Sequence, residues 1–470
     1  MAWTPERRRL LSRLAILVVL GGIWFSPAPE GLSPRAWHLF AIFASAILSV
    51  VVGAFPILTA SVLAVAAAVL SGTVSPGDAY SGFANPTILL IVVAFLVARA
   101  VVTCGLGQRL GYRAVSLFGR STLGLSYSIF VVDGLIAPAF PSNTARSGVL
   151  FPLALSVAEA AGAKPGVENR QRLGKFLMFS GIASLTLSSA LWLTAMAANP
   201  LGAEVARGFG IEIGFSSWLI SASVPTLVGM LLLPLLLYKL LRPEVTATPQ
   251  APAEARRALA ALGPLTRNER IVAATFVGMV ALWGTAATLK IDSTAVAFLG
   301  LGVLLASGVL TLADISKEGD VLATLLWFAA LFTLSDQLNR LGFMEFIGGR
   351  LVARLGGLPP LAAGVLLVVV YVLIHYLFVS QTAHLLALFG VFLGVGVKLG
   401  VPAAPLAFQL LFATNFFAAI TPQGSSANLL FAGSGYLSQG DLYRLGGITT
   451  AFSLVLYLVI GTPWLMLVAR

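Results

Sequence analysis

The amino-acid sequence predicts an all-α protein that crosses a membrane many times. Of its 470 residues, 58% are hydrophobic and only 10% are charged, whereas an ordinary soluble domain carries about 25% charged residues. The mean hydropathy is +0.95. Apolar runs of about 18 to 25 residues recur along the chain, and each is long enough to cross a bilayer as a helix. The single cysteine, Cys104, excludes a disulfide framework and a multi-cysteine metal site.

The apolar runs predict about 11 transmembrane helices, with bounds good to a few residues. The first run follows four arginines, as in a signal sequence, but no small-residue cleavage site closes it. We therefore interpret it as a retained helix. The expected helices lie at about 10–26, 36–54, 56–72, 86–104, 172–208 (broken), 216–240, 268–288, 293–311, 321–339, 403–432 (broken) and 444–468.

Two further apolar stretches, 121–160 and 359–399, are each interrupted near the middle by a short polar motif. The first motif is PSNTAR at 141–146, and the second is VSQTAH at 379–384. One crossing cannot hold about 40 residues at about 1.5 Å of rise each. Two full crossings would place each motif in a surface turn, where Gly, Lys or Asp would be usual. We therefore expect re-entrant hairpins whose tips stop inside the membrane.

The net charge is +11, and the distribution of the basic residues is typical of membrane topology rather than of nucleic-acid binding. Most of the 29 Lys and Arg residues fall on one side if both hairpins return to the side they enter from. Because positive residues concentrate in cytoplasmic loops, this places the N-terminus in the cytoplasm and the C-terminus outside. We expect a multi-pass protein of the inner (cytoplasmic) membrane that binds no nucleic acid.

The two halves of the chain echo each other. After an N-terminal helix in 1–35, we expect a first repeat at 36–240, a cytoplasmic linker at 241–267 and a second repeat at 268–470. Each repeat holds one hairpin and one broken helix. An odd number of crossings per repeat gives the halves opposite orientations, and paired broken helices in an inverted repeat point to the substrate site of a transporter.

Each hairpin tip exposes the N-terminus of its second arm, where free N–H groups and the positive end of the helix dipole favour an anion such as a carboxylate. Hydroxyl and amide groups at the tips would add hydrogen bonds. The alternative is that these side chains only cap the hairpin arms. The tip residues are Ser142, Asn143 and Thr144, and Ser380, Gln381 and Thr382.

Arg146 and His384 occupy equivalent positions, each four residues after the serine of its motif. A cation inside a membrane is costly and usually functional, so we expect both to bind substrate. Two alternatives stay open: Arg146 pairs with Asp133 on the preceding arm, and His384 is a neutral hydrogen-bonded histidine. His375 fits a structural role better.

No enzymatic motif is present, since the sequence contains neither HExxH nor CxxC and its three histidines form no ligand cluster. We therefore expect no enzyme. An anion channel and an intramembrane enzyme remain remote alternatives, and tips that close from both faces favour an occluded site over a continuous pore.

From about residue 30 to the end, the chain resembles the divalent anion/sodium symporter (DASS) superfamily. The motifs that carry the resemblance are PSNTAR, FLMFSGIASLTLSSALWLTAMAANPL at 176–201, HYLFVSQTAHLLALF at 375–389, and TPQGSSAN with GSGY at 421–436. The pattern is most similar to bacterial citrate/succinate antiporters and plastid 2-oxoglutarate/malate translocators. The resemblance implies a homodimer with an elevator mechanism. It also implies that the breaks complete the site, through Thr194, Asn199, Thr421, Pro422 and Ser425.

We therefore expect a transporter of C4–C5 dicarboxylates such as succinate, malate and 2-oxoglutarate, with citrate as a further candidate. A fixed positive charge at the site would hinder return of the empty carrier, so we expect obligatory exchange independent of sodium and no cofactor. The alternative is sodium-coupled symport, with sodium near Ser142 and Asn143. The second motif has Gln381 where sodium-coupled members have Asn, which puts a second sodium site in doubt.

Overall fold

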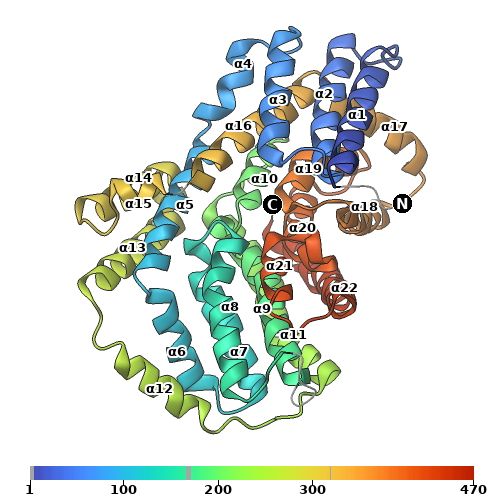
Figure 1. The fold of residues 1–470 in the computed structure, drawn as a ribbon. Helices are drawn as coiled ribbons and strands as arrows, with labels where there is room; N and C mark the ends of the chain where they lie inside the picture. The colour runs from blue at the N-terminus through green and yellow to red at the C-terminus, as the bar shows by residue number, and fades with distance from the viewer. Residues whose placement is uncertain (1–4, 166–170, 318, 470) are drawn as a thin grey trace.

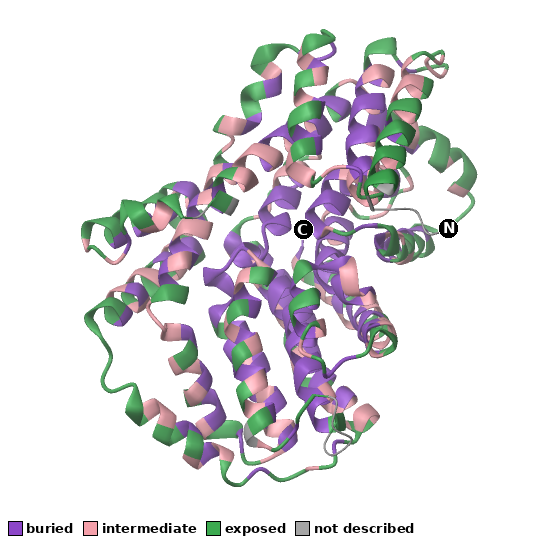
Figure 2. Cartoon of the chain, in the orientation of Figure 1, coloured by how far each residue is buried: buried purple, intermediate pink, exposed green. Residues whose placement is uncertain are grey.

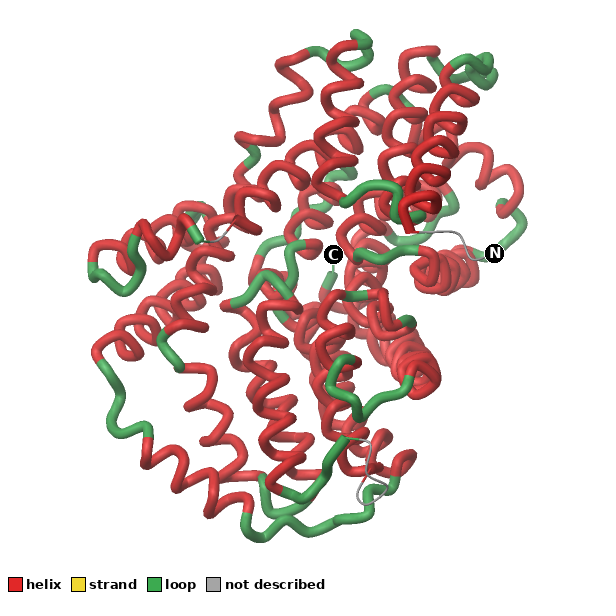
Figure 3. Tube along the Cα trace, viewed as in Figure 1, coloured by secondary structure: helices red, strands yellow, loops and turns green. Residues whose placement is uncertain are grey.

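The computed structural model describes residues 5–165, 171–317 and 319–469, and this part of the chain is built from helices (Figures 1 and 3). Its one β-type contact is an isolated bridge between Ser121 and Ala247. Short 3-10 helices are labelled η, except that η7 is a π-helix. The N-terminal half contains α1 (Pro5–Trp24), α2 (Pro34–Val51), α3 (Ile57–Leu70), α4 (Pro76–Tyr80), η1 (Ser81–Ala84), α5 (Pro86–Thr103), α6 (Leu106–Phe118), α7 (Thr122–Ile136), η2 (Ala137–Ala139), α8 (Asn143–Ala160), α9 (Gln171–Leu191), η3 (Leu193–Ala195), α10 (Ala198–Arg207) and α11 (Phe215–Leu241).

The C-terminal half repeats this style of construction. It contains α12 (Ala251–Ala261), α13 (Arg267–Leu289), α14 (Ser293–Ala306), α15 (Leu312–Ser316), α16 (Gly319–Arg340), α17 (Phe343–Leu355), α18 (Pro360–Ile374), η4 (His375–Leu377), α19 (Gln381–Lys398), α20 (Ala403–Phe416), η5 (Phe417–Ile420), η6 (Pro422–Gly424), α21 (Ser426–Ala432), α22 (Gln439–Leu456), η7 (Tyr457–Gly461) and α23 (Thr462–Val468).

Among the described residues, 11 helices are long and apolar enough to cross a membrane, which makes this a multi-pass membrane protein. The number agrees with the expectation, but the set differs. The hairpin arms α7, α18 and α19 qualify, whereas the expected spans 10–26, 56–72 and 293–311 do not. α1 carries several arginines in its N-terminal half, and α3 and α14 have only 14 residues each. At about 1.5 Å per residue, such helices fall short of a hydrocarbon core about 30 Å thick.

Both expected hairpins are present as two helical arms around a short 3-10 turn. The first is α7–η2–α8 and the second is α18–η4–α19. The residue before each second arm has nearly the same backbone, with φ −146° and ψ 122° at Ser142 and φ −146° and ψ 125° at Ser380. Glycine in the left-handed region precedes the amphipathic helix before each hairpin, at Gly105 (φ 82°) and Gly342 (φ 80°). These pairs agree with two structural repeats.

Both expected broken helices are also present. α9 ends at Leu191 and η3 leads through an extended residue, Met196, into α10. In the second half, α20 ends at Phe416, and η5 and η6 lead through the extended Ser425 into α21. Irregular backbone of this kind is tolerated in membranes where it is buried in protein or lines a cavity.

The polar linker is more ordered than its composition suggested. Residues 251–261 form α12, which packs against α6 along the lower edge of Figure 1. The segment before α12 is tied to the start of the first hairpin, because Thr122 N donates to Thr246 O at 3.1 Å and Thr248 N donates to Arg120 O at 3.0 Å. The linker therefore packs on the first half of the chain.

Buried residues gather around the two broken helices, while α12 and α15 are mostly exposed at the periphery (Figure 2). Almost every side chain of α9 from Leu173 to Leu191 is buried. α22 packs directly on η5: a Cβ atom at Gly446 would lie 1.8 Å from the carbonyl oxygen of Ala419. Only glycine fits at this contact, so the broken helix and α22 are in backbone contact.

Candidate functional site

The two hairpin tips meet in the interior of the protein. Asn143 Nδ2, at the first tip, donates to Gln381 Oε1, at the second tip, over 3.3 Å. Gln381 Nε2 in turn donates to Thr414 O at 2.9 Å, next to the second break. Two motifs more than half the chain apart are therefore joined by their amide side chains.

The tip serines cap the second arms. Ser142 Oγ accepts from Ala145 N at 3.2 Å, and Ser380 Oγ accepts from Ala383 N at 3.3 Å. The capping alternative therefore holds for these two hydroxyls. It does not exhaust the donors, since the first N–H groups of a helix have no partner within the helix. The N-termini of α8 and α19 still present donors and the positive ends of their dipoles.

A cavity of about 230 Å³ lies between the tips. It is lined by tip residues of both hairpins, by the breaks and by α5 and α16. Within the described part of the chain, none of its lining side chains is charged, and hydroxyls and amides form its polar wall. The lining residues are Phe95, Pro141, Ser142, Asn143, Thr144, Met196, Ala197, Thr324, Trp327, Phe328, Val379, Ser380, Gln381, Thr382, Ser425 and Ser426.

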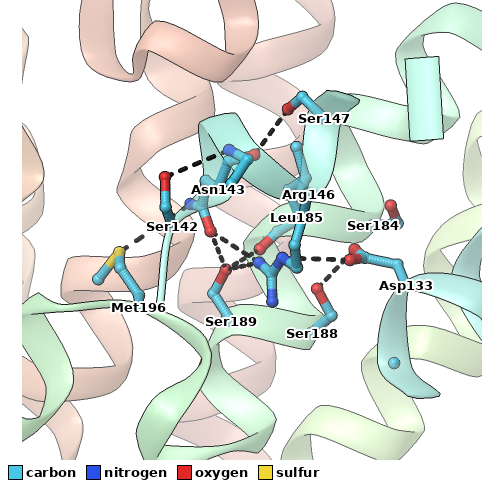
Figure 4. A network of polar contacts seen from close by, with 12 residues as sticks. Asp133, Ser142, Asn143, Arg146, Ser147, Ser184, Leu185, Ser188, Ser189 and Met196 are labelled. Atoms are coloured by element: carbon cyan, nitrogen blue, oxygen red, sulfur yellow. Dashed lines mark hydrogen bonds and ion pairs between the residues drawn. The ribbon is translucent and has the colours of Figure 1, made fainter. Parts of the chain in front are cut away.

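Arg146 does not line this cavity, contrary to expectation. Its side chain is fully buried and points from α8 towards Asp133 on α7 and Ser189 on α9 (Figure 4). Arg146 Nε lies 3.3 Å from Asp133 Oδ1, and both side chains have no exposed surface. Arg146 Nη2 donates to Asn143 Oδ1 at 2.7 Å and also to the Ser189 hydroxyl. The alternative of a pairing with Asp133 is therefore the one that the structure shows.

His384 is also turned away from the cavity. It is completely buried among the rings of Tyr371, Phe378 and Phe417. Its Nδ1 lies 3.2 Å from Nδ1 of His375, whose Nε2 lies 3.2 Å from the carbonyl oxygen of Gly424. Because that oxygen can only accept, His375 Nε2 carries a hydrogen and donates to it. The pair therefore joins the second hairpin to the second break, and His384, expected to bind substrate, does not line the cavity between the tips.

Four of the expected break residues do not line the cavity, and two of them, Thr194 and Asn199, hold its walls together. Thr194 Oγ1 donates to Pro138 O at 2.9 Å, which fastens the first break to the first tip. Asn199 Nδ2 donates to Ser189 O at 2.9 Å, and Asn199 Oδ1 accepts from Asn415 at 2.9 Å. Thr421 and Pro422 lie at the second break outside the lining. The only break residue of the expected set that reaches the cavity is Ser425.

Comparison with known proteins identifies the family. The family model described as "Sodium:sulfate symporter transmembrane region" matches residues 7–470. The chain belongs to this family. The DASS resemblance read from the motifs is thereby confirmed.

Relatives within the sodium:sulfate symporter family cover almost the whole chain. The chain is 41% identical over 454 residues to the "Putative malate transporter YflS" of Bacillus subtilis, covering 96% of this chain and 95% of that one. It is 38% identical to the "Dicarboxylate transporter 2, chloroplastic" of Spinacia oleracea, covering 93% and 78%. It is 31% identical to the "Citrate/succinate antiporter" of Escherichia coli, covering 96% of each chain.

The fold is also similar to a solved structure, the YdaH transporter of Alcanivorax borkumensis. The TM-score is 0.57 at 18% sequence identity, and the match covers 98% of this chain and 97% of that one. At this identity the likeness concerns the fold alone.

The name of the sodium:sulfate symporter family raises the question of a sodium ion, which the symport alternative places near Ser142 and Asn143. Asn143 Oδ1 accepts from Arg146 Nη2 and from Ser189 Oγ, each at 2.7 Å. Ser142 Oγ is engaged as a helix cap. Both acceptor positions of Asn143 Oδ1 are therefore occupied, one by a guanidinium and one by a hydroxyl.

Several lining residues of this family member were not expected from its sequence. Ser426 follows the predicted Ser425 directly, and its hydroxyl contacts that of Thr144. Met196 lies in the first break, where its extended backbone turns it to the tip. Phe95, Thr324 and Trp327 come from α5 and α16, in apolar runs that carry no motif. Of these, only Ser426 could have been inferred, from the consecutive polar residues of TPQGSSAN.

Proposed function

We propose that this protein is a secondary transporter that exchanges C4–C5 dicarboxylates such as succinate, malate and 2-oxoglutarate, with citrate as a larger candidate. The observation that carries the proposal is the uncharged polar cavity at which the N-termini of α8 and α19 meet. The names of three relatives, a malate transporter, a dicarboxylate transporter and a citrate/succinate antiporter, support the substrate class.

The cavity suits an anion with a charge at each end. One carboxylate would accept from the free N–H groups of Asn143 and Thr144 at the start of α8. The other would accept from those of Gln381 and Thr382 at the start of α19. Helix N-termini bind anions through oriented N–H groups and the helix dipole, without a cationic side chain. A volume of about 230 Å³ is small for a ligand pocket, since drug-sized ligands use about 300–1,000 Å³.

The hydrogen bond from the Arg146 guanidinium to Asn143 Oδ1 supports exchange that is independent of sodium. Because the guanidinium occupies the oxygen that a sodium ion would use, the carrier would bind no sodium at the first tip. The charge penalty expected for the empty carrier does not arise, because Asp133 lies beside Arg146 and offsets its charge. The citrate/succinate antiporter among the relatives agrees with exchange. No cofactor is needed in this scheme.

The proposed topology and movement involve the whole chain. The repeats 36–240 and 268–470 have opposite orientations, the N-terminus is cytoplasmic and the C-terminus is outside, and the linker 241–267 is cytoplasmic. In a homodimer of the inner membrane, the hairpins and broken helices move as a transport domain against the remaining helices. The paired hairpins and breaks support the repeat, and family membership supports the dimer and the elevator movement.

The test uses purified protein in liposomes, with or without internal succinate, and with or without an inward sodium gradient. We expect labelled succinate or 2-oxoglutarate to enter only preloaded vesicles, at a rate indifferent to sodium. Uptake of sulfate with no di- or tricarboxylate transport would overturn the substrate class.

Sodium-coupled symport is the second candidate, and two observations favour it: the family description and the pairing of Arg146 with Asp133 away from the cavity. It predicts sodium-driven uptake into empty vesicles. The same four-way assay therefore separates the candidates, and strong uptake of that kind would replace exchange by symport.

A further inference from the structure

A second cavity, of about 610 Å³, adjoins the site and contains two arginines from the start of the chain. We call it the arginine vestibule. It is lined by Arg9, Arg13, the turn from Val50 to Ile57, Trp327, Val379 and Ser380. Trp327, Val379 and Ser380 also line the 230 Å³ cavity between the tips. The two cavities are therefore neighbours across one wall, and that wall contains the cap residue of the second tip.

Arg13 is held in position within this vestibule. Its Nε donates to Ala54 O at 3.3 Å, and its Cζ lies 4.8 Å from the centre of the Phe55 ring. These contacts fix the guanidinium plane by a carbonyl and an aromatic ring, both uncharged. The remaining N–H groups of the guanidinium are left for another acceptor.

Neither arginine is neutralised. Across residues 5–165, 171–317 and 319–469, no carboxylate forms an ion pair with Arg9 or Arg13. They are the only charged side chains that line the described vestibule, and its other walls are almost entirely apolar. A cleft with charge of one sign and walls of low dielectric focuses the electric field and raises the local concentration of counter-ions.

We propose that Arg9 and Arg13 bind incoming dicarboxylate in the arginine vestibule and deliver it to the tips from the cytoplasmic side. This inference rests on the proposed function. In the proposed topology the N-terminus, and with it Arg9 and Arg13, lies on the cytoplasmic side, so the vestibule is expected to open to that side. The tip cavity holds donors but no cation, and the vestibule supplies the long-range attraction that neutral donors lack.

The experiment compares R9Q/R13Q with R256Q/R257Q, which removes the same two charges from exposed positions of α12 that do not line either cavity. Dicarboxylate exchange is measured in inside-out and right-side-out vesicles at ionic strengths of about 0.01 M and about 0.15 M, where the screening length falls from about 30 Å to about 8 Å. We expect R9Q/R13Q to raise KM about threefold or more, at the cytoplasmic face and low salt, with kcat unchanged. R9K/R13K should restore the wild-type KM, and R256Q/R257Q should match wild type throughout.

A phospholipid phosphate is the competing anion, because basic residues at the start of a membrane helix also attract anionic lipid. Vesicles made only of zwitterionic lipid distinguish the two. A KM effect that persists there supports the proposal, whereas an effect that requires anionic lipid assigns the arginines to lipid binding and overturns it.

Two further outcomes are decisive. If the wild-type KM at the cytoplasmic face does not change with ionic strength, or if R9Q/R13Q leaves KM unaltered while exchange is intact, only the vestibule is refuted. If wild-type protein exchanges no dicarboxylate at all, the proposed function fails and this inference fails with it.

Discussion

The Arg146 guanidinium donates to Asn143 Oδ1 at 2.7 Å, one helical turn behind the tip on which Asn143 meets Gln381. The arginine therefore fixes the orientation of the Asn143 amide, whose Nδ2 group donates to Gln381 at the second tip. Arg146, which we expected to bind the anion directly, lies outside the lining of the cavity between the tips and supports one of the residues that line it.

The buried pair of Arg146 and Asp133 gives the first prediction. Either R146Q or D133N leaves one buried charge without its partner, which typically costs about 3–5 kcal/mol. The double variant D133N/R146Q should recover most of that stability. The measurement is thermal unfolding in detergent. D336N is the control, because it breaks the partly exposed pair of Asp336 and Arg340, and such pairs contribute about 0–1 kcal/mol. Equal losses for D133N and D336N would contradict the argument.

The same arginine should be essential for transport. R146Q frees Asn143 Oδ1, so the amide at the tip loses its fixed orientation and exchange should be abolished. The rate is measured in the D133N/R146Q background, where folding is least affected. An intact exchange rate there would mean that the orientation of Asn143 does not matter.

The two tip threonines should contribute equally to affinity. Thr144 and Thr382 line the cavity next to the first N–H groups of α8 and α19. Loss of a hydrogen bond to a charged group costs about 1.5–3 kcal/mol, so T144A and T382A should each weaken dicarboxylate binding by about tenfold to a hundredfold. T285A is the matched control, because that hydroxyl is exposed and bonds only to its own helix. Unchanged binding in both tip variants would move the site elsewhere.

The opposite orientation of the repeats can be tested by cysteine labelling in a Cys104-free background. Pro249 in the linker and Gly357 after α17 are both exposed, and a Cβ atom at Gly357 meets nothing within 4 Å. A membrane-impermeant maleimide should label P249C only from the cytoplasm and G357C only from outside. Labelling of both variants from one face would break the assignment of the repeats.

Glu244, in the linker, gives a prediction about pH. Partial burial alone would raise the pKa of its carboxyl, but the backbone N–H groups that it accepts from, including those of Arg172 and Leu173, and the Arg172 guanidinium together hold that pKa below its ordinary value of 4.5. A pKa that is lower in the folded state stabilises the protein above the unfolded value, and this stabilisation is lost as pH falls through the folded value.

E244Q should therefore lower Tm at pH 7, and the difference from wild type should shrink once the pH falls below about 4.5. E254Q, on the exposed face of α12, removes the same charge without those contacts and serves as the control. A Tm difference for E244Q that does not vary with pH would exclude the carboxylate as its cause.

The sequence predicted the hairpins and breaks well because each is a local interruption of an apolar run. A polar motif in the middle of such a run indicates that the helix is interrupted there. The positions of these motifs agree with η2, η4, η3 and η5 within a few residues. α12 was not expected, although PAEARRALAA is rich in good helix formers.

The directions of single side chains were harder to predict. Spacing places Arg146 and His384 one turn behind the tips but does not say which face of each helix meets the cavity. That choice depends on Asp133 and Ser189 for the arginine and on His375 for the histidine. The cavity walls from α5 and α16 were not predicted. The sequence alone does not distinguish a Phe or Trp that faces lipid from one that faces a neighbouring helix or a ligand.

The backbone contact between Gly446 and Ala419 constrains which parts of the protein can slide past each other. A side chain between two helices can change its rotamer and let the helices shift. Two backbones in direct contact have no side chain between them that could adjust in this way. We therefore expect α22 to move together with the second break. Because η5 also contacts α9, the first broken helix should move with them. In G446A the added methyl group would clash with the Ala419 carbonyl oxygen and push α22 away from the second break, although no polar group is changed.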